Sequence, residues 1–99
     1  MKLPEDAFIR ELIPEFVDDW LNNLNGEYSD ILAEKDADSL YRVGHTLKGS
    51  CLQFGLDEIA QLGIRLMGHS KAGEWDEAEA LMKEIQTSFE ECKKELEQM

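Results

Sequence analysis

Apolar residues recur at intervals of three and four along nearly the whole chain, and this periodicity limits the possible folds more than any other feature. Such spacing is typical of amphipathic helices, and no stretch alternates with the period of two that a half-buried strand requires. The pattern is interrupted near residues 36–38, 55–57 and 72–75. Because these connections are short, consecutive helices are expected to lie side by side and antiparallel. The sequence therefore predicts an all-α protein, an up-down-up-down four-helix bundle.

The N-terminal third predicts a further element. Pro4 and Pro14 each suit the first turn of a helix, so the residues between them are expected to form a short capping helix packed across one end of the bundle. The first long helix would then continue from Pro14 to about Lys35. It contains Gly26, which costs about 1 kcal/mol relative to alanine inside a helix, and packing must offset that cost.

Three residues are expected to mark the ends of the later helices. Asp36 is placed to cap the second long helix, since a carboxylate at this position can accept hydrogen bonds from free backbone N–H groups. Gly55 and Gly73 follow the second and third helices, where glycine readily adopts the left-handed conformation that ends a helix.

The length and charge of the chain restrict its function. A chain of 99 residues suits a single domain, residues 1–99, with a modest core. The 22 acidic and 10 basic residues give a net charge of -12, which argues against partners such as nucleic acid or an anionic membrane. No apolar run approaches the roughly 20 residues of a membrane span, and the first residues lack the apolar segment of a signal peptide. Cys51 and Cys92 are interpreted as free thiols of a reducing compartment, so a cytoplasmic location is expected.

The negative charge is unevenly distributed along the chain. Residues 1–35 and residues 74–99 each hold nine acids and three bases, whereas residues 36–73 hold four of each. Solvated acidic faces on the outer helices account for most of this difference. The neutral middle segment would also let an anion approach without crossing a negative field.

One histidine in the neutral segment is predicted to point away from the core. The helix expected over residues 39–54 has an apolar stripe of Leu40, Val43, Leu47, Cys51 and Phe54. At about 100° per residue, His45 lies roughly 200° from Val43 and from Leu47, so it faces outward. An incidental surface histidine is the simplest interpretation, and the residues that follow are what argue against it.

A cation and bare backbone are placed beside this ring. Lys48 and Gly49 follow His45 by three and four residues and therefore share its face. A neutral imidazole is nucleophilic at physiological pH and could accept a phosphoryl group. Lys48 would offset the charge of the phosphoramidate, and Gly49 would let a partner come close. For Gly44, which precedes the histidine, access to the ring and tight helix packing are equally good explanations.

The same face offers a surface for a partner. Tyr41 and Leu52 lie four residues before and seven residues after His45, where they would form an apolar rim that a partner could cover. Arg42 is a second nearby cation, although a solvated or ion-paired surface arginine is the slightly better interpretation of this residue.

These residues carry a resemblance to a known family. The run His45-Thr46-Leu47-Lys48-Gly49-Ser50, followed by Phe54-Gly55, resembles the signature of histidine-containing phosphotransfer (HPt) domains, the carriers of multistep two-component relays. Residues 12–16 are similar to the start of the first bundle helix in small stand-alone members, and residues 71–76 are similar to their last turn. The resemblance therefore extends over essentially the whole chain.

The resemblance implies a function and the residues that perform it. His45 would be the phosphoacceptor, Lys48 the charge partner of the phosphoryl group, and Gly49 the residue that keeps the site open. The chain would take the group from a receiver-domain aspartate or a histidine kinase and pass it to a receiver of a response regulator. It would be a monomeric carrier without ATP-dependent kinase activity and without a cofactor of its own, because the receiver would supply Mg²⁺.

One position departs from the family pattern. Many members place Glu or Gln 22 residues after the phosphoacceptor, where the side chain hydrogen-bonds the imidazole and fixes its tautomer, but this chain has Met67 there. A thioether cannot make a strong bond of that kind. Gln53, Gln61 or water could orient the ring instead, or the ring could rotate freely. Gln53 and Met67 are expected to belong to the partner-binding surface with Tyr41.

Other functions have less support from the residues. A non-phosphorylated helical adaptor could use the face around His45 for binding alone. A metal- or haem-binding bundle could use His45 with Met67 or Cys51, but the histidines and cysteines lack zinc-ligand spacing. His69, near the end of its helix, suits an interaction with the helix dipole or plain exposure. No phosphate-binding glycine loop is present, so the chain is not expected to be a kinase by itself.

Overall fold

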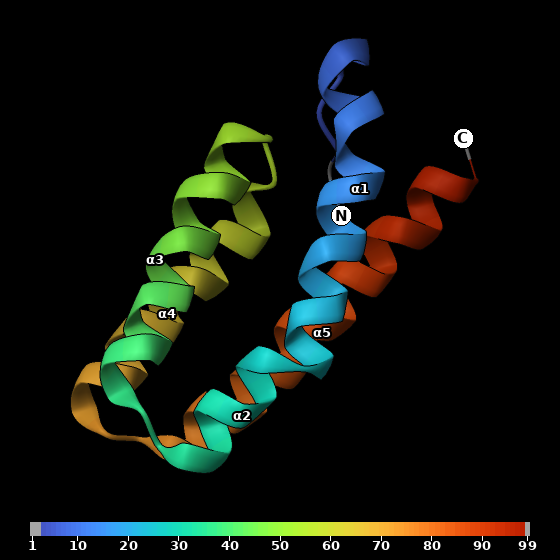
Figure 1. The fold of residues 1–99 in the computed structure, drawn as a ribbon. Coiled ribbons are helices and arrows are strands. Elements are labelled where there is room, and N and C mark those ends of the chain that lie inside the picture. Colours follow the sequence, from blue (N-terminus) through green and yellow to red (C-terminus); the bar gives the residue numbers. More distant parts are fainter. Residues whose placement is uncertain (1–2, 99) are drawn as a thin grey trace.

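Helices make up almost all of the protein. The computed structural model describes residues 3–98, in which the helices are α1 (Ala7–Asn25), α2 (Glu27–Glu34), α3 (Ala37–Gln53), α4 (Asp57–Ala72) and α5 (Trp75–Glu97). Figure 1 shows that α2 continues in the direction of α1, so that these two form one arm, and that α3, α4 and α5 then alternate in direction. The predicted all-α, up-down-up-down four-helix bundle is confirmed. No helix within residues 3–98 is both long and apolar enough to cross a membrane.

The later helices begin and end where the sequence predicts. The carboxylate of Asp36 accepts hydrogen bonds from the hydroxyl of Ser39 at 2.7 Å and from its backbone N–H at 3.1 Å, and so caps α3. These bonds favour the charged form and lower the pKa of Asp36. Gly55, with φ of 75°, follows α3, and Gly73, with φ of 68°, ends α4. Residues other than glycine rarely adopt such φ values.

The N-terminal arm differs from the prediction, because no separate capping helix precedes Pro14. Instead, α1 continues through this proline. Pro14 removes one helical hydrogen bond, which typically costs about 3 kcal/mol. Ile13 and Val17, on either side of it, are completely buried, and their burial offsets that cost.

The break in the arm lies at Gly26. Its φ of -122° and ψ of -103° lie outside the helical region, so α1 ends at Asn25 and α2 begins at Glu27. The long helix predicted to continue to Lys35 is therefore divided into two at a glycine, the residue that least favours a helix interior after proline.

Two kinds of packing hold the bundle together. Aromatic rings fill the space between the arm and the rest: Phe16 lies 4.4 Å from Phe54 of the α3–α4 turn, and Trp20 stacks on Phe89 of α5 at 5.8 Å, measured between ring centroids. The α3–α4 pair instead approaches through glycine. A Cβ atom on Gly44 would lie 2.8 Å from the carbonyl oxygen of Gly63, and a Cβ atom on Gly63 would lie 2.8 Å from the carbonyl oxygen of Gly44.

Candidate functional site

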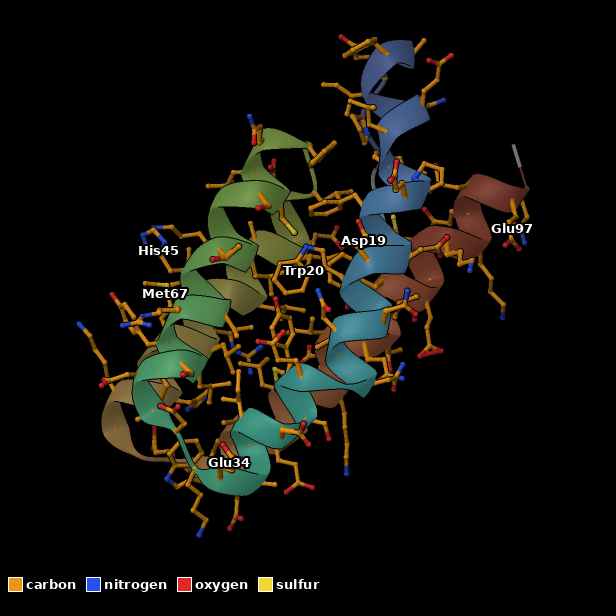
Figure 2. All side chains as sticks on the ribbon, viewed as in Figure 1. Asp19, Trp20, Glu34, His45, Met67 and Glu97 are labelled. Atoms are coloured by element: carbon orange, nitrogen blue, oxygen red, sulfur yellow. The ribbon has the colours of Figure 1, made fainter. Side chains whose placement is uncertain are left out.

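His45 lies on the outward face of α3. The buried residues of this helix are Leu40, Val43, Gly44, Leu47 and Cys51, whereas His45 is exposed, as predicted. Figure 2 shows the side chains of His45 and Met67 on the same side of the α3–α4 pair, pointing away from the arm. The imidazole is thus presented to solvent on a surface to which both helices contribute.

The two glycines near His45 have different surroundings. Gly44 is buried, and a side chain there would collide with Gly63 and Met67 of α4. Gly49 is exposed, and a Cβ atom there would have no atom of another helix within 4 Å. Packing between helices therefore explains Gly44, whereas nothing in the packing requires a glycine at position 49. The open space beside Gly49 lies on the face of His45.

Lys48 is a half-buried cation one turn along from His45. Its backbone nitrogen would lie 2.9 Å from a Cβ atom on Gly63, so α4 packs directly against this part of α3. No ion pair joins the Lys48 ammonium to a carboxylate among residues 3–98. A cation with a fixed backbone and an unneutralised charge therefore accompanies the imidazole.

The apolar rim extends over both helices. Tyr41 is half-buried, and Leu52 is 50% exposed at the other end of the face. Ile64 of α4 is 43% exposed, and it precedes Met67 by three positions, which places the two on neighbouring parts of the α4 surface. Ile64 was not among the residues predicted from the sequence. An apolar residue outside the buried stripe of α4 is the sequence feature that could have identified it as a surface contact.

The remaining predicted surface residues lie farther to the side. Arg42 is exposed and lines a groove between α2 and α3, together with Tyr28 and Ser39. It therefore lies on the side of α3 that faces α2, and not on the side of Met67. Gln53 is exposed at the end of α3.

Met67 occupies the position at which the resemblance described above implies an orienting amide or carboxylate. It is half-buried, and its Cγ atom would lie 2.9 Å from a Cβ atom on Gly44, the neighbour of His45. Within residues 3–98, no hydrogen bond to the imidazole of His45 is formed, either by Gln53 or by Gln61. The described part of the chain thus leaves both ring nitrogens accessible to water or to a partner.

The other histidine and the cysteines have structural surroundings. Nδ1 of His69 lies 3.1 Å from Oε1 of Glu74, and this pair bridges the turn between α4 and α5. Burial raises the pKa of Cys51 to about 12 and that of Cys92 to about 11, which keeps both thiols protonated. No Cα atom of α3 lies within 8 Å of one in α5, too far for a disulfide, which needs about 4.4–6.8 Å.

Candidate metal ligands are also dispersed. Among residues 3–98, no three His, Cys, Asp or Glu side chains gather in a way that could hold a metal ion. The Nδ1 atom of His69 is engaged with Glu74, and the Cys51 thiol lies in the core on the opposite face of α3 from His45.

The comparison with protein families agrees with this geometry. The model of the Hpt domain family matches residues 9–99. The chain belongs to the Hpt domain family. Membership implies histidine phosphotransfer in a two-component phosphorelay, by a carrier and not by a kinase, and Hpt domains generally interact with histidine kinases and receiver domains. No curated protein and no solved structure matches the chain significantly.

Proposed function

We propose that His45 accepts a phosphoryl group from the aspartate of a receiver domain, or from a histidine kinase, and passes it to the aspartate of another receiver. The observation that carries this proposal is the exposure of His45 beside the open space at Gly49. Nδ1 of His69, the other histidine, is instead engaged with Glu74 at the α4–α5 turn.

The transfer step needs a lone pair on one imidazole nitrogen. That nitrogen attacks the phosphorus of the phospho-aspartate, so that an N–P bond forms while the acyl P–O bond breaks, and the electron pair leaves with the aspartate carboxylate. Transfer to the next receiver is the reverse reaction on a different aspartate. Because no described protein group bonds the other ring nitrogen of His45, its proton faces water or the partner.

Lys48 supports the charged product. A phosphoryl group on His45 adds negative charge one turn from an ammonium that has no carboxylate partner in the described part of the chain. A charge-assisted contact to a phosphoryl oxygen would stabilise the phosphorylated state and the transition state that leads to it. Gly49 would leave room for the receiver backbone, since no side chain projects there.

The partner would supply the remaining catalytic groups. Phosphoryl transfer gains most of its rate from positioning and from charge neutralisation around the phosphoryl oxygens. We assign the Mg²⁺ ion to the receiver domain, and we assign docking to Tyr41, Leu52 and Met67 around His45. Ile64 extends this docking surface on α4, and Arg42 and Gln53 lie at its margin.

Phosphorylation by a receiver tests the proposal. A receiver domain phosphorylated on its aspartate with radiolabelled acetyl phosphate should label the wild-type chain with an acid-labile group. His45→Gln should abolish the labelling and leave the far-UV circular dichroism unchanged, because His45 is exposed. The matched control, His69→Gln, should still be labelled.

The outcome that contradicts the proposal is equally specific. Labelling that persists in His45→Gln and disappears in His69→Gln would place the acceptor at the α4–α5 turn. Receivers that bind the wild-type chain through this face but never label it would instead favour an adaptor that acts by binding alone.

A further inference from the structure

Lys71 is placed on the His45 face by an aromatic ring. Its Nζ atom lies 5.2 Å from the centroid of the Tyr41 ring. Tyr41 precedes His45 by one helical turn of α3, and Lys71 follows Met67 by one turn of α4. A cation within about 6 Å of an aromatic face is attracted to it, so the ring fixes where this charge lies. The contact joins the last turn of α4 to the face that carries the imidazole.

No carboxylate among residues 3–98 forms an ion pair with Lys71. Elsewhere in the described chain, Arg65 pairs with Glu84, Lys83 with Glu79, and Lys93 with Asp18. Lys71 has no such partner among residues 3–98, although the chain carries a net charge of -12. An aromatic ring holds an ammonium in place without cancelling its charge, which leaves that charge available to a partner.

Lys71 and Lys48 lie on opposite sides of His45 along α3. Lys48 follows the histidine by three residues, whereas Tyr41, over which Lys71 is held, precedes it by four, or about 6 Å along the helix axis. In the function proposed above, Lys48 contacts the transferred group. Lys71, as long as it stays over the Tyr41 ring, faces the area beside the site that a docked partner would cover.

We propose that Lys71, positioned by Tyr41, is an affinity-determining contact for the acidic surface around the phosphorylated aspartate of the receiver domain. This inference rests on the function proposed above. The receiver surface must be acidic there, because Mg²⁺ is held by carboxylates and other oxygen ligands. Lys71 thus attracts and orients the receiver, whereas Lys48 acts on the phosphoryl group.

The two roles have different kinetic signatures. Replacing a charge at the edge of an interface mainly changes the association rate and its salt dependence, and not the chemical step. Lys71→Gln should therefore raise the Kd for the receiver by about 2- to 5-fold at low ionic strength, the range found for exposed charge pairs, and by less at high salt. The transfer rate at saturating receiver should not change.

The experiment uses the receiver domain that labels the wild-type chain most rapidly. Its Kd in the presence of Mg²⁺ and its saturated transfer rate are measured at two salt concentrations for each variant. Lys71→Arg should keep wild-type affinity, because a guanidinium also stacks on an aromatic ring. Tyr41→Leu should weaken binding in the same salt-dependent way, and this salt dependence separates loss of the lysine's position from loss of apolar docking area. The matched control is Lys83→Gln, a surface lysine of α5 paired with Glu79.

Each failure has its own signature. A Kd for Lys71→Gln equal to that of the wild-type chain and of Lys83→Gln overturns the inference while the proposed function stands. A fall in the saturated transfer rate also overturns it, since Lys71 would then act on the phosphoryl group. Unchanged affinity in Tyr41→Leu removes the positioning role of the ring. If no receiver labels the wild-type chain on His45, the proposed function fails and this inference fails with it.

Discussion

Gly44 and Gly49 lie in the same helix, on either side of His45, but the regions around them are opposite in character. At Gly44, α3 and α4 are so close that a Cβ atom would lie 2.8 Å from the carbonyl oxygen of Gly63. At Gly49, no atom of a neighbouring helix lies within 4 Å of that position. Gly44 permits contact between two backbones, and Gly49 leaves the surface beside His45 uncovered. A helix can therefore combine a tight packing contact and an accessible site within little more than one turn.

The largest effect is expected from Gly44→Ala, which inserts a methyl group between the two backbones. Its neighbours would be the Gly63 carbonyl oxygen at 2.8 Å and the Met67 backbone nitrogen at 3.1 Å, neither of which can rotate away. Overpacking of this kind costs about 3 kcal/mol at the upper end of its usual range. Urea unfolding would measure the loss of stability.

Gly68→Ala is the matched control for that substitution. Gly68 is an exposed glycine of α4, and a Cβ atom there would have no atom of another helix within 4 Å, so alanine should stabilise the helix by about 0.8–1 kcal/mol. If Gly44→Ala were as stable as Gly68→Ala, the α3–α4 contact would not be as close as the structure has it.

Lys48→Ala is expected to slow phosphoryl transfer without disturbing the α3–α4 contact at Gly44. Its backbone contacts α4, but only the side chain is removed. Loss of one charge-assisted contact, about 1.5–3 kcal/mol, should slow the saturated transfer rate by roughly 10- to 100-fold. Single-turnover transfer from a phosphorylated receiver would measure this rate. Unchanged rates with several receivers would remove Lys48 from the mechanism.

Gly49→Ala should have opposite effects on stability and on transfer. Alanine should stabilise the helix by about 1 kcal/mol, because the added methyl group meets no atom of another helix. The same methyl group would narrow the space for a receiver, so transfer should be slower, and Gly49→Leu should slow it further. Unfolding and transfer measured on the same preparations would separate the two effects. Full transfer activity in the leucine variant would show that the open space is not needed.

The fold and the outward position of His45 could be predicted from the sequence, because helical spacing is a local property. The apolar stripe of α3 placed His45 outward, and Asp36 and Gly55 marked the ends of the helix. Gly44 remained open to two interpretations, since the choice depends on Gly63 in another helix. Local patterns do not report how two helices are aligned, and the placement of Lys71 over Tyr41 is unpredictable for the same reason.

Tertiary packing explains where local signals were misleading. Pro14 is a reasonable start for a helix when it is considered alone. In the protein, Ile13 and Val17 are both completely buried, and this burial keeps α1 continuous through the proline. Ile64 was not predicted because the apolar spacing of α4 marks its buried stripe, whereas a surface that binds a partner consists of apolar residues outside that stripe.

The smallest expected effect concerns Met67, which packs against Gly44 and lies on the face of His45. Its Cγ atom lies against Gly44, and its side chain points to the same side as His45 (Figure 2). In Met67→Gln, an amide of similar length could accept a hydrogen bond from one imidazole nitrogen and leave the other with its lone pair outward. Orienting partners change activity by about 10- to 100-fold at metal-bound histidines. A gain below about 10-fold in the saturated transfer rate is expected here, because the amide would orient the ring through a single hydrogen bond.

Measuring affinity together with rate separates this role from docking. If Met67 instead packs against the receiver, glutamine would weaken binding and would not accelerate transfer. Met67→Leu is the matched control, since it keeps an apolar side chain of similar size and adds no hydrogen-bonding group. A faster saturated rate in the glutamine variant alone would show that the open face of α3 lacks an orienting group. A higher Kd with no faster rate would make Met67 an interface residue and would leave His45 to be oriented by its partner.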